Sequence, residues 1–171
     1  MTDPTPLDTP IRDEVDEVIA QWLVQRPELD TDPLEVFSRL IRLTRHVERM
    51  RKTVFARNAL ESWEFDMLTA LRRQPDHTLT AGQLMKETLV SSGTVTNRLD
   101  RMARKGLLER HTDERDGRIV HVKATALGIE RADAAFADLL SVEADILTMF
   151  KLEDNAQAAA YMRRLLCYFE Q

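Results

Sequence analysis

Basic and polar side chains that could bind phosphates and base edges of nucleic acid are concentrated between residues 91 and 123. This segment carries eight lysine and arginine residues and five acidic ones, a net charge of +3, which leaves −8 for the rest of the chain. A basic segment on an acidic body is typical of a local phosphate-binding face. The overall charge of −5 therefore does not exclude a nucleic-acid-binding protein.

The pattern from Ser91 or Ser92 to Lys105 predicts a basic helix whose faces have different roles, because successive residues are 100° apart. The apolar side chains that face inward are Val95, Leu99, Met102 and Ala103. The polar side chains that we assign to DNA contacts are Ser92, Thr94, Thr96, Asn97, Arg101 and Arg104. Asn, Arg and Thr can meet base edges or phosphates in a major groove. Arg98 lies on the flank, where it could turn back toward a pocket beneath the helix.

The elements around this helix predict a winged helix-turn-helix from about Leu79 to Ala124. Thr80 and Gln83 have the spacing of a capping box and begin a short helix. The inward side chains of that short helix are Leu84, Met85 and Leu89. Gly106 is placed to end the basic helix.

Two short strands follow, with sequences LLERHT and RIVHVKA, joined by the turn DERDG. The turn carries Arg115 and Arg118 at its tip. An arginine at a hairpin tip suits insertion into a minor groove, where the negative potential is concentrated. The predicted wing therefore adds two residues to the DNA-binding set.

The chain as a whole predicts a mainly α-helical protein with a small β wing. We divide it into an N-terminal arm (residues 1–12), N-terminal helices (13–60), the DNA-binding lobe (61–124) and C-terminal dimerisation helices (125–171). The first two helices carry apolar stripes, and the helix after residue 125 is about 38 Å long at 1.5 Å per residue. These stripes exceed what one small lobe can cover, so we expect a two-fold dimer that binds a pseudo-palindromic site on double-stranded DNA.

The basic face of the helix over residues 33–57 is interpreted as a solvated face, with partner binding as the alternative. Its residues are Arg39, Arg42, Arg45, Arg49 and Arg51. Cys167 is the single cysteine of the sequence, which excludes an intramolecular disulfide framework. We expect it to be a small buried apolar residue, with a redox switch as the alternative. No apolar run approaches the length of a membrane span and the first residues are unlike a signal peptide, so we expect a cytoplasmic protein.

Enzymatic chemistry finds no support in the sequence. There is no glycine-rich phosphate loop and no nucleophile elbow, and the four histidines lack the spacing of a zinc site. We therefore expect no catalytic residues, no metal and no cofactor beyond a small-molecule effector.

The stretch SSGTVTNRLDRMARKGLLERHTDERDGRIVHVKATALG resembles the MarR family of winged-helix transcriptional regulators. It matches the family's recognition helix, its D-x-R-D-x-R wing and the strand leading into the long dimerisation helix. The resemblance covers roughly residues 34–170 and implies a homodimeric DNA-binding regulator. Ala124 stands where the family commonly has leucine.

The added N-terminal helix with QWLVQRPELD, together with EFDML and TNRLDR, resembles the narrower urate-responsive HucR/PecS group of that family. The resemblance implies a ligand-binding set of Trp22, Asp66, Arg98 and Arg110. In that reading Trp22 packs on a flat aromatic anion and Arg98 pairs with its charge. Repulsion would move Asp66 and shift the recognition helix, and Arg110 would link the pocket to the wing.

Each ligand-site residue has a simpler interpretation. Trp22 could be a core or interface residue, Asp66 and Arg98 could form a structural ion pair, and Arg110 could contact phosphate. The leading functional interpretation is a repressor whose DNA affinity is lowered by urate or a related purine or phenolic anion. The alternative is a MarR-like regulator that responds to a different phenolic ligand, to oxidation or to a protein partner.

Overall fold

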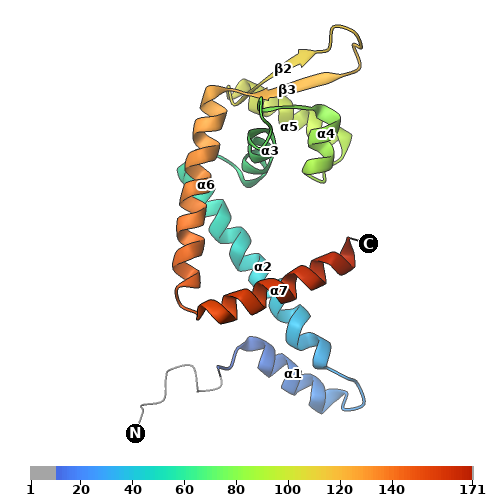
Figure 1. Ribbon diagram of the computed structural model, residues 1–171. Helices are drawn as coiled ribbons and strands as arrows, with labels where there is room; N and C mark the ends of the chain where they lie inside the picture. The colour runs from blue at the N-terminus through green and yellow to red at the C-terminus, as the bar shows by residue number, and fades with distance from the viewer. Residues whose placement is uncertain (1–10, 171) are drawn as a thin grey trace. The chain divides into compact units, whose positions relative to one another are not determined.

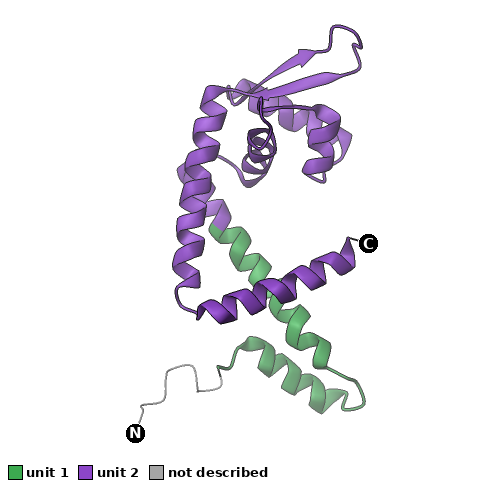
Figure 2. Cartoon of the chain, viewed as in Figure 1, with its two compact units in different colours: residues 1–50 green, residues 51–171 purple. Residues whose placement is uncertain are grey.

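The computed structural model describes residues 11–170, and these divide into two compact units between Met50 and Arg51 (Figure 2). The boundary between the units falls within the second helix, ten residues before the boundary that the sequence suggested. The predicted N-terminal arm lies outside the described residues except for Ile11 and Arg12.

The first unit contains α1 (Glu14–Gln25) and most of α2 (Asp32–Arg57) (Figure 1). Asp13 precedes α1 and accepts hydrogen bonds from the backbone N–H groups of Val15 (2.8 Å) and Asp16 (3.3 Å). The Asp16 carboxylate in turn accepts the Asp13 N–H at 2.7 Å, which satisfies donors that the first turn leaves open. The helix therefore begins where acidic side chains can cap it.

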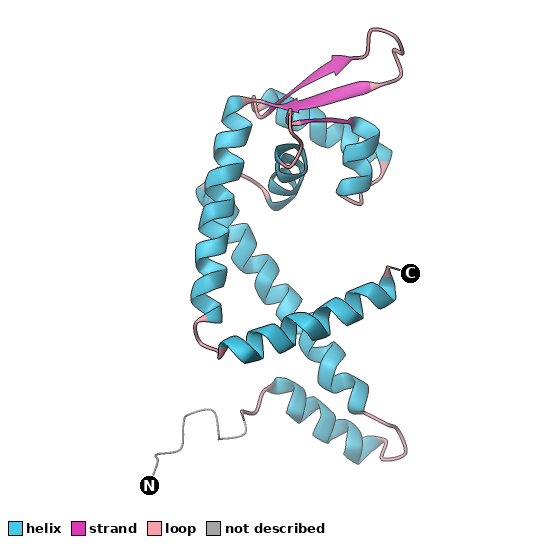
Figure 3. Ribbon diagram, viewed as in Figure 1, coloured by secondary structure: helices cyan, strands magenta, loops and turns pink. Residues whose placement is uncertain are grey.

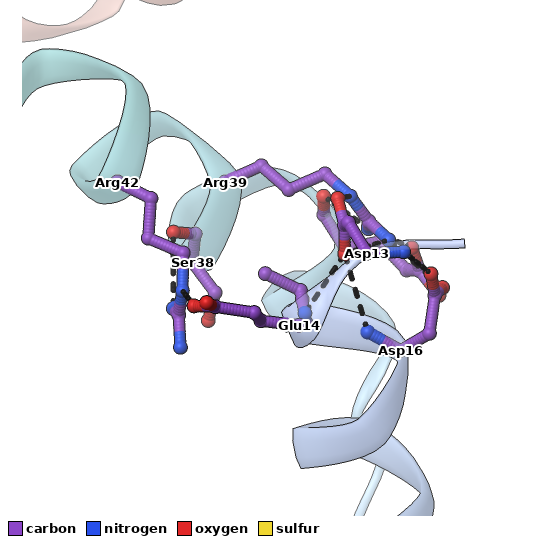
Figure 4. A network of polar contacts seen from close by, with 8 residues as sticks. Asp13, Glu14, Asp16, Ser38, Arg39 and Arg42 are labelled. Atoms are coloured by element: carbon purple, nitrogen blue, oxygen red, sulfur yellow. Dashed lines mark hydrogen bonds and ion pairs between the residues drawn. The ribbon is translucent and has the colours of Figure 1, made fainter. Parts of the chain in front are cut away.

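Arg39 on α2 connects this cap to the second helix (Figure 4). Its guanidinium donates to Asp13 at 2.7 Å and to Asp16 at 2.9 Å, and it also pairs with Glu35. The hydrogen bond to Asp13 is the main cause that raises the pKa of Arg39, and the same bond lowers the pKa of Asp13. The basic face of α2 is therefore partly used for contacts inside the unit and is not simply solvated as predicted.

The second unit contains the rest of the chain, and its sheet is drawn in magenta in Figure 3. Its elements are α3 (Ser62–Arg72), β1 (Thr78–Thr80), α4 (Ala81–Glu87), α5 (Ser92–Arg104), β2 (Leu108–Thr112), β3 (Val120–Ala124), α6 (Ala126–Leu147) and α7 (Leu152–Phe169). The three strands are antiparallel in the order β1-β3-β2. This arrangement is the predicted mainly helical fold with a small β wing.

The core of this unit packs around α3, whose Met67, Leu68 and Leu71 have no exposed surface. The inward face predicted for α5 is confirmed at Val95, Leu99 and Met102, which are buried, while Ala103 is partly exposed. The Phe55 ring at the end of α2 stacks on Phe65 of α3, with centroids 4.1 Å apart. The basic helix is thus anchored by an apolar core on one side only.

Local signals correctly placed the start of α4 and the end of α5. The Thr80 side chain accepts a hydrogen bond from the Gln83 backbone N–H at 3.2 Å. The Gln83 side chain in turn accepts the Thr80 backbone N–H at 2.8 Å. Gly106 follows α5 with φ +69°, a conformation that side chains disfavour. Gly128 lets α6 approach the strand region closely, since a Cβ there would lie 2.1 Å from the Leu107 carbonyl oxygen.

Two features in the DNA-binding lobe differ from the sequence prediction. The residues Thr78–Thr80 form a third strand, paired with β3, in addition to the two strands that the sequence predicted. Leu89 was assigned to the inward face of the short helix, but that helix ends at Glu87 and Leu89 is 93% exposed with φ +52°. The three-residue strand is too short to show a period, and the turn into α5 begins earlier than the apolar pattern indicated.

Large apolar side chains remain exposed on α1, α6 and α7. Trp22 is 48% exposed, and Phe136, Leu140 and Leu147 on α6 are about as exposed. Cys167 on α7 is exposed, which corrects the expectation that it is buried; α7 has no buried residue among those described. Within residues 11–170, no helix combines the length and the apolar character needed to cross a membrane.

Candidate nucleic-acid interface and the charged cluster behind it

The polar side chains assigned to DNA contact lie on the exposed face of α5. Those side chains are Ser92, Thr94, Thr96, Asn97, Arg101 and Arg104. Arg98 is only partly exposed, which agrees with its predicted position on the flank of the helix. The helix therefore presents donors and acceptors outward along most of its length, as a helix that enters a major groove must.

The wing between β2 and β3 is ordered by Asp113 at its base. One carboxylate oxygen of Asp113 accepts the backbone N–H groups of Arg115 (2.8 Å) and Asp116 (3.0 Å). The other accepts a hydrogen bond from His121 Nε2 at 3.0 Å. The His121 contact is the main cause that lowers the pKa of Asp113 to about 2. The Arg118 side chain extends from this turn with 95% of its surface exposed.

Trp63 at the start of α3 lies beside two arginines of α5. The guanidinium carbons of Arg98 and Arg101 are 5.1 Å and 4.9 Å from the centroid of its ring. Both distances are within the range of a cation–π interaction. Arg98 therefore turns toward α3, as the flank position suggested, and Arg101 does so as well.

Two glutamates at the start of α3 bind the cations of the same helix edge. Glu61 accepts the indole N–H of Trp63 at 2.7 Å and the Arg101 Nη2 group at 2.6 Å. The hydrogen bond from Trp63 is the main cause that lowers the pKa of Glu61, and the charges of Arg101 and Lys105 act in the same direction. Glu64 is fully buried and accepts Lys105 Nζ at 2.6 Å.

Asp66 lies on α3, about one turn after Trp63, and lines a hollow of about 400 Å³ between α3, α6 and the last turns of α2. Its side chain is 54% exposed and 3.5 Å from Arg51 Nη2. Partial burial raises the pKa of the Asp66 carboxyl, against the opposing charges of Arg51 and Arg98. The rings of Phe65 and Phe136 also line the hollow, which joins an apolar surface to charged groups.

Three of the four predicted ligand residues lie on α5 or interact with one of its residues. Arg98 lies on the helix, Asp66 interacts electrostatically with it, and Arg110 Nη2 lies 2.7 Å from Asp100 Oδ1 of the same helix. Trp22 belongs to the first unit, where it lines a hollow with Leu29 and other residues of that unit. The ligand-binding role of this set stays a prediction.

Glu61, Trp63 and Glu64 were not predicted from the sequence as part of this cluster. A usable signal was present, because the cations Arg98, Arg101 and Lys105 recur at i, i+3 and i+7 and so share one edge of a helix. The acidic and aromatic partners gave no comparable pattern. In the described part of the chain, from residue 11 to residue 170, no His, Cys, Asp and Glu side chains form a group of three suited to a metal ion.

Comparisons with known proteins agree with this architecture. The model of the MarR family matches residues 60–119. The HTH-type transcriptional regulator PecS of Dickeya dadantii (strain 3937) is 31% identical over 153 residues, which cover 89% of this chain and 92% of PecS. The HTH-type transcriptional repressor YetL of Bacillus subtilis (strain 168) is 29% identical over 105 residues, covering 61% of this chain and 63% of YetL.

Solved structures share the fold at lower sequence identity. AbsC, a MarR family regulator from Streptomyces coelicolor, matches with a TM-score of 0.71 at 17% identity, over 83% of this chain and 97% of AbsC. A DNA complex of MepR from S. aureus matches with a TM-score of 0.69 at 22% identity, over 78% of this chain and 98% of MepR. With a relative above 30% identity over nearly the whole chain and a winged lobe with this geometry, the protein belongs to the MarR family of DNA-binding transcriptional regulators and is not an enzyme.

Proposed function

We propose that this protein is a homodimeric, sequence-specific repressor whose DNA affinity is lowered by a small aromatic anion such as urate. The DNA-binding part of the proposal uses the exposed face of α5 and the wing arginines Arg115 and Arg118. The similarity to PecS, a transcriptional regulator, and to YetL, a transcriptional repressor, supports the regulatory role. The MepR complex with DNA supports a direct contact between this fold and the duplex.

Homodimer formation is supported by the apolar side chains that one chain leaves exposed. Phe136, Leu140 and Leu147 on α6, and Tyr161 and Leu166 on α7, are each about half exposed. A two-fold dimer would cover such side chains and would present two α5 helices to a pseudo-palindromic operator. Light scattering coupled to size exclusion tests this part directly, since a monomer at micromolar concentration would contradict it.

The observation that carries the ligand proposal is the position of Arg98 on α5. Its guanidinium lies against Trp63, its side chain is only partly exposed, unlike that of Arg101, and its charge acts on the carboxyl of Asp66. A ligand that pairs with Arg98 would therefore bind the DNA-reading helix itself. It would also bring a second negative charge close to Asp66, whose ionised form is already disfavoured by partial burial.

The remaining roles follow from the chemistry of the side chains. Trp22 would stack on the flat ring of the ligand, and Arg110, through its pair with Asp100, would couple the site to the strand that leads into the wing. The ligand can release DNA only by binding more tightly to the conformation that has low DNA affinity. Asp66 is the group whose displacement would create that difference.

The test is a titration of a fluorescently labelled DNA fragment from upstream of the gene, with and without millimolar urate. We expect urate to weaken DNA binding by the wild type, and Trp22→Phe to bind DNA normally while losing most of that response. Val24→Ala, which alters another exposed apolar side chain of α1, is the control. A full response in Trp22→Phe would return Trp22 to a structural role.

The fluorescence of the two tryptophans must be separated in this experiment, because Trp63 lies beside Arg98. In a Trp63→Phe variant the remaining emission comes from Trp22, so a change on adding urate reports contact near α1. A thermal-shift screen of urate, other purines and phenolic acids then separates a urate response from a response to a different ligand. If no compound in the screen shifts the melting temperature or the DNA affinity, the small-molecule part of the proposal is wrong.

A further inference from the structure

We infer that Glu61 is an internal competitor for Arg101, so that its carboxylate lowers DNA affinity by holding the arginine away from the duplex. This inference rests on the proposed contact between Arg101 and DNA. It assigns a positioning role to the residue that precedes α3, which lies outside the recognition helix and outside the predicted ligand site.

The geometry behind the inference is a pair of contacts on one guanidinium. Arg101 Nη2 donates to Glu61 Oε1 at 2.6 Å, and its guanidinium carbon lies 4.9 Å from the centroid of the Trp63 ring. Trp63 in turn donates its indole N–H to the other oxygen of Glu61 at 2.7 Å. The Trp63 ring therefore fixes the Glu61 carboxylate by a hydrogen bond, and Arg101 contacts both the ring and the carboxylate.

The contact between Glu61 and Arg101 is exposed enough for DNA to replace Glu61 as the partner of Arg101. About half of the Glu61 and Arg101 side chains is exposed, so a phosphate or a base edge could take the place of the carboxylate. The contact with Glu61 occupies the Nη2 group of Arg101 and neutralises its charge, whereas an arginine binds phosphate best through two parallel N–H groups. DNA therefore competes with Glu61 for Arg101.

Lys105 shows why Glu61, and not its neighbour Glu64, is the competitor. Lys105 Nζ is 2.6 Å from the buried carboxylate of Glu64 and 3.8 Å from Glu61. The buried pair has a structural role, because Glu64 also accepts the Glu61 backbone N–H at 2.9 Å. Glu61 is left to neutralise Arg101, whose position on α5 is on the side that we assign to DNA.

The cost of displacement sets the expected effect. Exposed ion pairs typically favour the paired state by a factor of about two to five. Removing the competitor should therefore tighten DNA binding about two- to fivefold for every sequence. In the wild type one ion pair is exchanged for another, whereas without Glu61 the arginine would neutralise a phosphate with full counterion release. The slope of log K against log salt should then steepen by about 0.9.

The experiment measures DNA binding by fluorescence anisotropy at several salt concentrations for the wild type, Glu61→Gln and Glu61→Asp. Glu61→Asp keeps the net charge but withdraws the carboxylate by one methylene, so it should also tighten binding. Glu130→Gln, which changes the same charge at an exposed position of α6, is the matched control and should have less effect. Thermal unfolding of each variant confirms that it is folded.

A double-mutant cycle with Arg101→Gln decides between the outcomes. If Glu61 acts through Arg101, the gain from Glu61→Gln disappears in the Arg101→Gln background. An equal gain in both backgrounds would mean direct repulsion of DNA by the carboxylate, and would overturn the inference. No gain in the wild-type background would overturn it as well. If Arg101→Gln itself leaves DNA binding unchanged, the failure lies in the proposed DNA contact and not in the competition.

Discussion

The wing and the basic edge of α5 both carry arginines assigned to DNA, but acidic side chains bind them in opposite ways. In the wing, Asp113 and Asp116 accept backbone N–H groups, and the Arg118 guanidinium remains 95% exposed and 4.0 Å from Asp116. Along α5, Glu61 and other acids accept the side chains themselves. The acidic residues of the wing therefore hold its backbone, whereas Glu61 and Glu64 neutralise the cations along the edge of α5.

This difference predicts different thermodynamics for the two regions. A wing arginine can neutralise a phosphate without losing a close partner, so its contact should carry the full salt dependence of counterion release. A cation of the α5 edge must exchange partners, so its contact should depend less on salt. The segment's net charge of +3 therefore overstates the charge that α5 offers to DNA at once.

The largest expected effect comes from removing the ion pair between Lys105, at the end of α5, and Glu64 of α3. Lys105→Gln leaves the fully buried Glu64 without its cation, and we expect a loss of about 2 kcal/mol in the free energy of unfolding, below the usual cost for a buried pair because Lys105 is partly exposed. Urea denaturation measures this loss. Lys123→Gln, on an exposed position of β3 in the wing, is the control and should change stability little. Equal losses in both variants would remove the contrast between the two regions.

A smaller effect is expected at the wing tip, on binding and not on stability. Arg118→Ala should weaken binding to all DNA sequences about fivefold and reduce the magnitude of the salt slope by about 0.9. Arg118→Lys keeps the charge and should retain the slope. An unchanged slope in Arg118→Ala would remove this residue from the phosphate or minor-groove contacts.

The smallest effect concerns the base of the wing. The pKa of Asp113 is lowered to about 2 from an ordinary value of 3.8, so the ionised carboxylate stabilises the wing at neutral pH. Because the folded-state pKa is the lower one, this stabilisation is present above about pH 4 and is lost as the pH falls toward 2. His121→Gln should move the pKa back toward its ordinary value in an NMR titration of the Asp113 carboxyl. His111→Gln, at the paired position on β2, is the control. A pKa that is the same in the wild type and His121→Gln would exclude His121 as the main cause.

Features encoded by neighbouring residues were predictable from the sequence. The inward face of α5, the Thr80 and Gln83 cap and the positive φ at Gly106 each depend on residues within a few positions of one another. The exposed positions on α5 followed from the same periodicity. Such signals need no knowledge of what packs against the helix.

Features that depend on contacts distant in sequence were not predictable. Arg39 and Arg51 belong to the same basic face of α2 in sequence, yet Arg39 binds Asp13 and Arg51 lies 3.5 Å from Asp66. Glu61 meets Arg101 across 40 residues, which no local period reveals. The exposure of Trp22 and Cys167 likewise depends on what covers α1 and α7, and a single amphipathic pattern cannot distinguish a core from an interface.

The most direct test of the account compares Arg98→Gln with Arg101→Gln, since both arginines lie on the same Trp63 ring. DNA affinity is measured for each variant with and without millimolar urate. We expect Arg98→Gln to keep DNA affinity within about twofold and to lose the urate response, and Arg101→Gln to weaken DNA binding and keep the response. If Arg98→Gln instead weakens DNA binding as much as Arg101→Gln and still responds to urate, sensing and DNA reading are not divided between these two side chains.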